Sequence, residues 1–346
     1  MKNSGHADEK SHPTKVKAIA AVSGGLDSTL AAALISRLGI DVVLLYVKHL
    51  FSRGERKEAA LKEFANRLGL PLRIVDATIE HLDVIRYPKH GYGRGMNPCL
   101  DCRIFLLRIA KRVMEEEGAQ FVITGEVLNQ RPMSQHRSAL DVVAEESGLS
   151  DRLLRPLCAN LLPETLPVRM GWISRDDLYS FSGRSRREQV ALAESLGITG
   201  YQQPAGGCLL TERVYAARLR DAFEHSDKKG MGIDQFRLLR FGRHFRLSER
   251  TKAIVGRNEG ENEVLSGFSQ GMILIEPIDL MGPTTLVEGE PTEEEILLAA
   301  ALTARYADSE PGRPARFRVS ADGSEREVSV IPLERDDPRI PSWRIG

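Results

Sequence analysis

Short apolar runs alternate with helical segments along the first third of the chain, and this alternation constrains the fold more than any other feature. The strand-like runs are 16–22, 41–47, 72–77 and 121–126, and the helical patterns between them are 29–39, 55–68 and 99–118. Nearly continuous apolar strands joined by helices are typical of a doubly wound parallel sheet. We therefore expect an α/β domain over 15–212, after a flexible polar tail at 1–14.

A second composition begins near residue 235. Residues 236–257 interleave seven basic side chains with three phenylalanines, whereas 258–310 holds twelve acidic residues against the single Arg305. Such an abrupt change in charge favours a separate domain. We expect a smaller α+β domain over 235–346, joined by a linker at 213–234.

The whole-chain composition limits the classes of partner. Lysine plus arginine equals aspartate plus glutamate, 48 against 48, so any nucleic acid must bind through local basic patches. No apolar run approaches the roughly 20 residues that span a bilayer, and the N-terminus has no apolar signal segment. We expect a cytoplasmic protein without a membrane partner. Four cysteines in 346 residues do not make a disulfide framework.

The hexapeptide SGGLDS lies between the first strand and the first helix, at 23–28. Gly24 and Gly25 allow a tight turn whose N–H groups face an anion, and the helix N-terminus adds partial positive charge. Ser23 and Ser28 can donate to phosphate oxygens, while Asp27 would hold Mg²⁺ against them. The alternative is a glycine turn with a serine helix cap.

The polar stretch 124–135 follows the fourth strand, at the sheet edge where doubly wound folds bind ligands. In it, Gly125 permits close approach, and Glu126, Gln130 and Arg131 are candidates to contact ATP or RNA; the alternative is an ordinary polar loop. The residues assigned to ATP binding are Ala21, Ser23, Gly24, Gly25, Asp27, Ser28, Tyr46, Gly125 and Glu126.

SGGLDS resembles the SGGxDS signature of the PP-loop ATP pyrophosphatases, which share an adenine nucleotide alpha hydrolase-like fold. The resemblance covers roughly 15–212. It implies that ATP is cleaved between its α and β phosphates, leaving AMP on a carbonyl oxygen of an acceptor. The loop itself does not identify that acceptor.

Three of the four cysteines lie in recognisable motifs. NPCLDCR (97–103) supplies Cys99 and Cys102, and PAGGCLLT (204–211) supplies Cys208. In a reducing compartment such a pair favours a metal, cluster or redox site over a structural disulfide. A chance CxxC and a zinc site are the alternatives, although zinc usually needs four ligands and no histidine stands at ligand spacing from the pair.

This layout resembles the tRNA-thiolating branch of the PP-loop enzymes, of the MnmA, TtuA and ThiI types. By that resemblance Cys102 and Cys208 are the catalytic cysteines, together with Asp27. Cys99 departs from the usual MnmA motif, which has aspartate there. A third cysteine is typical of the thiolases in which three thiolates hold a [4Fe–4S] cluster, so Cys99, Cys102 and Cys208 become candidate cluster ligands, with a cysteine persulfide as the alternative sulfur carrier.

Two stretches are candidates for RNA contact. One is the helix start in SGRSRREQ (182–189), and the other is FRLLRFGRHFRL (236–247), where the phenylalanines either stack on bases or form core. The assigned RNA-binding residues are Arg184, Arg186, Arg240, Arg243 and Arg246. The motif GRNEGENE (256–263) resembles the C-terminal RNA-binding module of NFACT proteins, which implies RNA binding over roughly 235–335.

Together these resemblances imply an ATP-dependent tRNA sulfurtransferase that adenylates a uridine carbonyl and replaces its oxygen with sulfur. The expected sulfur donor is sulfide, or a persulfide from a cysteine desulfurase relay, and a homodimer is one option for its assembly. One alternative is a PP-loop ligase acting on a small molecule. Another is a non-catalytic RNA-binding adaptor. None of the eight histidines is assigned a role.

Overall fold

The computed structural model describes residues 15–51, 55–199, 201, 208–321 and 323–346. The tail expected at 1–14 and most of the PAGG stretch before Cys208 lie outside this range. The chain divides into two compact units. The first contains residues 1–93 and 98–208, and the second contains 94–97 and 209–346.

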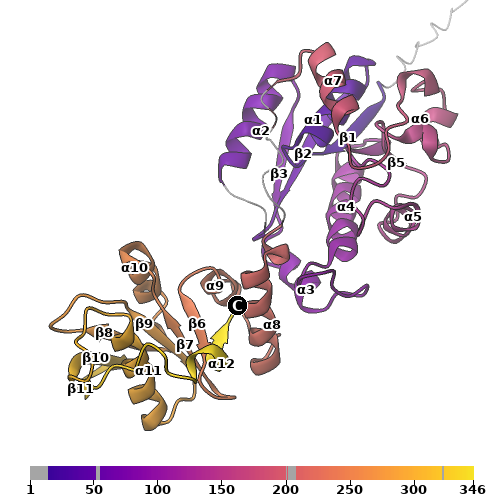
Figure 1. Ribbon diagram of the computed structural model, residues 1–346. Helices are drawn as coiled ribbons and strands as arrows, with labels where there is room; N and C mark the ends of the chain where they lie inside the picture. The colour runs from indigo at the N-terminus through magenta and orange to yellow at the C-terminus, as the bar shows by residue number, and fades with distance from the viewer. Residues whose placement is uncertain (1–14, 52–54, 200, 202–207, 322) are drawn as a thin grey trace, which may run out of the picture. The chain divides into compact units, whose positions relative to one another are not determined.

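The described part of the first unit is built on a five-stranded sheet with the order β3-β2-β1-β4-β5, in which neighbouring strands are parallel. The strands are β1 (Lys17–Ala21), β2 (Asp41–Lys48), β3 (Leu72–Asp76), β4 (Phe121–Thr124) and β5 (Leu153–Leu154). The helices are α1 (Leu26–Arg37), α2 (Glu55–Leu68), α3 (Glu80–Arg86), α4 (Cys99–Glu116), α5 (Arg137–Glu146), α6 (Leu166–Arg169) and α7 (Arg187–Ser195). This arrangement confirms the doubly wound α/β prediction (Figure 1).

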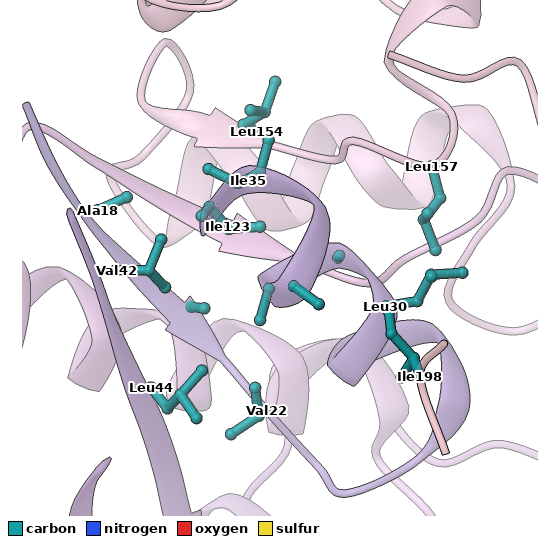
Figure 2. Close-up of a cluster of buried hydrophobic side chains, with 14 of the residues drawn as sticks. Ala18, Val22, Leu30, Ile35, Val42, Leu44, Ile123, Leu154, Leu157 and Ile198 are labelled. Carbon is teal, nitrogen blue, oxygen red and sulfur yellow. The ribbon is translucent and has the colours of Figure 1, made fainter. Parts of the chain in front are cut away.

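Helices cover both faces of this sheet because successive strand residues point to opposite sides. Ala18 and Ala20 of β1 face a core that includes Leu30 and Ile35 of α1, and residues of α2 and α7 join it. Figure 2 shows part of this cluster, with side chains of β1, β2, β4 and β5 lying around Leu30 and Ile35 of α1. Ile19, between the two alanines, belongs to the opposite core, which α4 and α5 cover.

The described part of the second unit contains a seven-stranded antiparallel sheet with the order β11-β10-β8-β9-β7-β6-β12. Its strands are β6 (Arg243–Arg246), β7 (Thr251–Val255), β8 (Ile273–Pro277), β9 (Thr285–Gly289), β10 (Ala315–Ala321), β11 (Ser324–Val330) and β12 (Arg344–Ile345). Its helices are α8 (Arg213–His225), α9 (Ile233–Leu238), α10 (Glu259–Gly267), α11 (Glu293–Arg305) and α12 (Ile340–Trp343). The expected α+β class is therefore confirmed.

Segment 213–234, expected to be a linker, lies within this second unit and forms α8. The helix buries Tyr215, Leu219 and Phe223, and the Tyr215 hydroxyl donates to the carbonyl of Phe236 at 2.9 Å. Phe236 itself is fully buried, as is Phe245. These two phenylalanines are therefore core residues and are not available to stack on bases.

Candidate active site

The SGGLDS loop joins β1 to α1, as the sequence predicts. Gly24 has φ 77°, a left-handed conformation that glycine adopts without steric cost. Gly25 is the N-cap of α1 and, as a glycine, offers the first turn no side-chain acceptor. The Ser28 hydroxyl lies 3.2 Å from that of Ser23 and donates to the Gly25 carbonyl. Both hydroxyls thus border a helix N-terminus that is suited to bind an anion.

Gly125, directly after β4, packs against this loop. A Cβ atom at this position would overlap the backbone of Asp27 and Ser28. The strand end and the phosphate loop can touch only because residue 125 has no side chain. This close approach places the expected ATP-binding Gly125 next to SGGLDS.

Within the described residues, the side-chain partners of the Asp27 carboxylate contact one of its two oxygens. Its Oδ2 accepts a hydrogen bond from Nε2 of Gln130 at 3.0 Å, and the guanidinium of Arg186 lies 3.5 Å from the same oxygen. Its Oδ1 is buried and has no hydrogen-bond partner in the described part of the chain. An unpartnered carboxylate oxygen beside a phosphate-binding loop fits a Mg²⁺ ligand.

Glu126 is buried and paired with two arginines. Its carboxylate lies 2.8 Å from Nε of Arg155 and 3.2 Å from Nε of Arg103, and the Thr124 hydroxyl also donates to it. Burial alone would raise the pKa of Glu126, but the two guanidiniums hold it below its usual value. This carboxylate anchors the end of β4 to α4 and β5, so any contact with ATP stays a prediction.

The other two expected ATP-binding residues lie on neighbouring strands. Ala21 is half-buried at the end of β1, next to the loop. Tyr46 of β2 is buried in the hydrophobic core that α1 covers.

Two of the three expected cysteine ligands begin α4. Cys99 is its first residue, and the Cys102 N–H donates to the Pro98 carbonyl at 2.8 Å. Cys99 and Cys102 are half-buried, whereas Cys208 is exposed. Burial raises the pKa of the Cys102 thiol to about 12, Arg103 opposes the shift, and Cys208 and Cys99 add to it. The three sulfurs therefore share one electrostatic neighbourhood.

These cysteines supply the thiolate chemistry that an iron–sulfur cluster needs. Among the described residues, however, no three His, Cys, Asp or Glu side chains are close enough together to form a ready metal site. The donor set fits a cluster in kind, although the described side chains do not stand in a preformed metal-binding arrangement.

Sequence reasoning missed a histidine at this site. His81 of α3 lies with its Nε2 3.2 Å from Sγ of Cys102. The two residues are 21 positions apart on different helices, and no motif spacing signals their contact. The sequence analysis assigned no histidine a role, and the contact of His81 with Cys102 brings one to this site.

Arg131 connects the cysteines with the phosphate loop. Desolvation and then the like charges of Arg103 and Arg186 lower the pKa of Arg131, while Cys99 and Asp27 act in the opposite direction. Groups from both motifs are thus close enough to act on one guanidinium. Among the expected RNA-binding residues of this unit, Arg186 pairs with Asp27 and Arg184 is exposed in the turn before α7.

The three expected RNA-binding arginines of the second unit differ in their surroundings. Arg246 pairs through two nitrogens with Asp221, at 3.0 and 2.6 Å. Arg243 donates to the Gly256 carbonyl at 2.9 Å and lies 4.7 Å from the centre of the Tyr306 ring. Arg240 is exposed at the end of the α9 region. To bind a phosphate, Arg243 and Arg246 would have to give up these intramolecular partners. The exposed Arg240 makes none of the contacts described for those two residues.

Comparison with known families agrees with this division. Residues 13–160 match the family model described as thiamine biosynthesis protein (ThiI). Residues 13–160 are therefore similar to ThiI. This match includes the phosphate loop, Cys99 and Cys102 but ends before Cys208. Residues 242–344 match the model described as NFACT protein RNA binding domain, so both resemblances seen in the sequence are confirmed.

Similar proteins carry the names of two enzyme classes. The chain is 25% identical to a tRNA-specific 2-thiouridylase MnmA from Azorhizobium caulinodans, covering 90% of this chain and 84% of that protein. It is 33% identical to a glutamine-hydrolyzing GMP synthase from Aquifex aeolicus, covering 32% of this chain and 21% of that protein. A second MnmA, from Xanthobacter autotrophicus, is 31% identical, with 40% of each chain covered.

A solved 4-thiouridine synthetase–RNA complex with bound ATP aligns with 53% of this chain and 41% of that one, at 21% identity and a TM-score of 0.37.

Along the described residues, no helix combines the length and the apolar character that crossing a bilayer requires.

Proposed function

We propose that this protein is an ATP-dependent tRNA sulfurtransferase that makes a thiouridine. The observation that carries the proposal is the proximity of two motifs. Gly125 packs against the backbone of Asp27 and Ser28 in the phosphate loop. Its neighbour Glu126 lies 3.2 Å from Nε of Arg103, which directly follows Cys102. A site for activating an acceptor with ATP and a site for handling sulfur thus lie close together. The similarity to proteins named as tRNA thiouridylases supports the same assignment.

In the proposed reaction, ATP binds with its phosphates on the SGGLDS loop and the N-terminus of α1. Asp27 would hold Mg²⁺ through Oδ1, which has no partner within the described residues. Arg186 and Arg131 would balance the negative charge that develops on pyrophosphate. The uridine carbonyl oxygen attacks the α-phosphorus, and pyrophosphate leaves.

Sulfur then replaces the activated oxygen. Sulfide attacks the carbonyl carbon, the C–O bond breaks, and AMP departs with the oxygen. If a cysteine persulfide is the donor, its terminal sulfur makes the same attack and remains joined to the carrier cysteine. A second cysteine thiolate then attacks the carrier sulfur, the S–S bond breaks to leave the thiouridine, and a cellular thiol reduces the resulting disulfide. Cys99, Cys102 and Cys208 are the residues that would hold a [4Fe–4S] cluster or carry a persulfide. When bound, such a cluster supplies an iron that holds sulfide as a nucleophile. The raised pKa of the Cys102 thiol means that this sulfur needs a metal or a hydrogen-bond donor to act as a thiolate at neutral pH.

The second unit would bind the tRNA. Its match to the NFACT RNA-binding model supports this role. Within the first unit, the exposed Arg184 next to Arg186 offers a further phosphate contact. The target base would have to leave its stack to reach the α-phosphate.

The test measures pyrophosphate release from Mg·ATP, with and without tRNA from a strain that lacks thiolation. The proposal predicts release that requires tRNA and is lost in Asp27→Asn. Asp176→Asn is a matched control, because Asp176 is an exposed carboxylate in the same unit. Release that continues in Asp27→Asn would contradict the assigned phosphate site.

A second candidate function is a PP-loop ligase that activates a small-molecule carbonyl. The 33% identity to a GMP synthase favours it, because that similarity is found in a protein that is not named as a tRNA thiolase. It predicts pyrophosphate release without tRNA and no dependence on the three cysteines. ATP binding with no release under any condition would instead favour an RNA-binding adaptor.

A further inference from the structure

The side chain of His81 is enclosed beside the Cys102 sulfur. His81 is 1% exposed, and its Nε2 lies 3.2 Å from Sγ of Cys102, within reach of a hydrogen bond to sulfur. The histidine comes from α3 and the cysteine from the first turn of α4. Two separate helices therefore bring one imidazole nitrogen to one sulfur atom.

Packing fixes the orientation of this imidazole. The ring centre of His81 lies 4.4 Å from that of His49, 5.4 Å from that of Phe105 and 5.9 Å from that of Phe51. Rings on several sides leave little freedom for the side chain to rotate.

The surroundings of the two ring nitrogens indicate which of them carries a proton. Nδ1 of His81 is buried and has no hydrogen-bond partner in the described parts of the chain. A proton on Nδ1 would be a buried donor without an acceptor, and orphaned buried N–H groups are rarer in proteins than unmatched acceptors. The proton therefore belongs on Nε2, and the hydrogen bond runs from Nε2–H to Sγ.

We propose that His81 is a positioning residue whose Nε2–H donates to the Cys102 sulfur, fixing the direction of that sulfur and stabilising negative charge on it for sulfur transfer. This inference rests on the proposed sulfurtransferase function. A donor suits Sγ as a free thiolate and as a cluster ligand alike, because in both states the sulfur bears negative charge. His81 thus acts through Cys102 and does not itself touch the substrate.

The test compares how fast Cys102 reacts with iodoacetamide in the metal-free protein at pH 8, measured by mass spectrometry of the Cys102 peptide. His81→Phe keeps a ring but removes the donor, and should slow the reaction by about fourfold to fifteenfold, since thiolate loss is partly offset by higher nucleophilicity. His81→Gln restores an N–H donor and should recover most of the rate. Equal rates in the wild type and His81→Phe would overturn the proposal.

Two controls separate this effect from loss of structure. His49→Phe keeps a ring stacked on His81 and should leave the Cys102 rate near that of the wild type. If His81→Phe does not fold, as judged by circular dichroism, His81→Met fills similar space without a donor and takes its place under the same criteria. A slow Cys102 reaction in His49→Phe as well would assign the effect to packing and overturn the positioning role.

A second readout keeps this inference distinct from the proposed function. The amount of thiolated nucleoside formed per pyrophosphate released should fall in His81→Phe and recover in His81→Gln, and an unchanged ratio would overturn the role in sulfur transfer. If the wild type releases no pyrophosphate with tRNA, the proposed function fails, whereas the alkylation rates still decide whether His81 donates to Cys102.

Discussion

At the scale of single residues, Gly125 is a position where the proposed ATP site has no room for a side chain. A methyl group there would overlap the backbone of Asp27 and Ser28. We expect Gly125→Ala to reduce tRNA-dependent pyrophosphate release on the order of 100-fold, because a shift of about 1 Å in a positioned site has that effect. Gly267→Ala, at a glycine with open space around it, is the control and should retain release. Normal release by Gly125→Ala would show that the loop can move without cost.

The four cysteines differ in how deeply they are buried. Cys158 is fully buried and its thiol donates to the Glu126 carbonyl, so it is a core residue. We expect Cys99→Ser to lower the thiolated nucleoside formed per pyrophosphate released, and to remove bound iron from anaerobically purified protein if a cluster is the sulfur carrier. Cys158→Ser is the matched control and should leave both measurements unchanged. Iron-free protein with full sulfur transfer would instead favour the persulfide route.

Sequence reasoning located the motif residues but not the residues that support them. SGGLDS and the two cysteine motifs carry local signatures, because backbone turns and thiolate chemistry demand particular residue types. His81 and Arg155 carry none, since their roles depend on contacts with Cys102 and Glu126 across 21 and 29 positions. Such contacts depend on how the helices and strands pack, which local spacing does not record.

At the scale of helices and strands, the ion pairs of Glu126 tie the end of β4 to α4 and β5. Removing one partner leaves a charge buried without compensation, and Arg155 is 6% exposed. We expect Glu126→Gln to lower the free energy of unfolding of the first unit by about 3–5 kcal/mol, measured by urea denaturation at pH 7. Glu164→Gln breaks the exposed pair with Arg175 and should cost less than about 1 kcal/mol. Equal losses would contradict the buried pair's role.

The same pair predicts a pH dependence. The folded-state pKa of Glu126 lies below its usual value, so the unfolded state takes up the proton first as the pH falls. The stabilisation is therefore complete above the usual carboxylate pKa and is lost as the pH drops through the folded-state value. We expect the wild type to lose stability over this acidic range more steeply than Glu126→Gln, and parallel curves would contradict the assignment.

The local sequence pattern predicts some of the strands and helices of this protein and misses others. The sequence predicts strands β1 to β4 within a few residues. β1, β2 and β4 are mostly buried and form nearly continuous apolar runs, and the half-buried edge strand β3 still contains Leu72, Ile74 and Val75. The strands of the second unit were expected only as part of an α+β class. Its edge strand β11 is mostly exposed, with burial at Val328 and Val330 alone, so hydrophobicity marks it weakly. The sequence predicts a linker where helix α8 lies, because charged residues of its exposed face alternate along the chain with the apolar residues that pack within the unit.

At the scale of the whole molecule, the equal numbers of acidic and basic side chains mean that affinity for tRNA depends on particular arginines. Arg240 is exposed, whereas Arg243 is held by the Gly256 carbonyl and the Tyr306 ring. We expect Arg240→Gln in the full chain to weaken tRNA binding and to reduce the slope of log affinity against log salt concentration by about one, as loss of one phosphate contact requires.

Arg243→Gln is the matched comparison for this prediction. Its guanidinium already has partners within the second unit, so its removal should lower thermal stability and leave the salt slope close to that of the wild type. The measurement is a titration of labelled tRNA at several salt concentrations, with melting curves for each variant. A reduced slope for Arg243→Gln and none for Arg240→Gln would reverse the assignment, because it would mean that RNA displaces the Gly256 and Tyr306 contacts on binding.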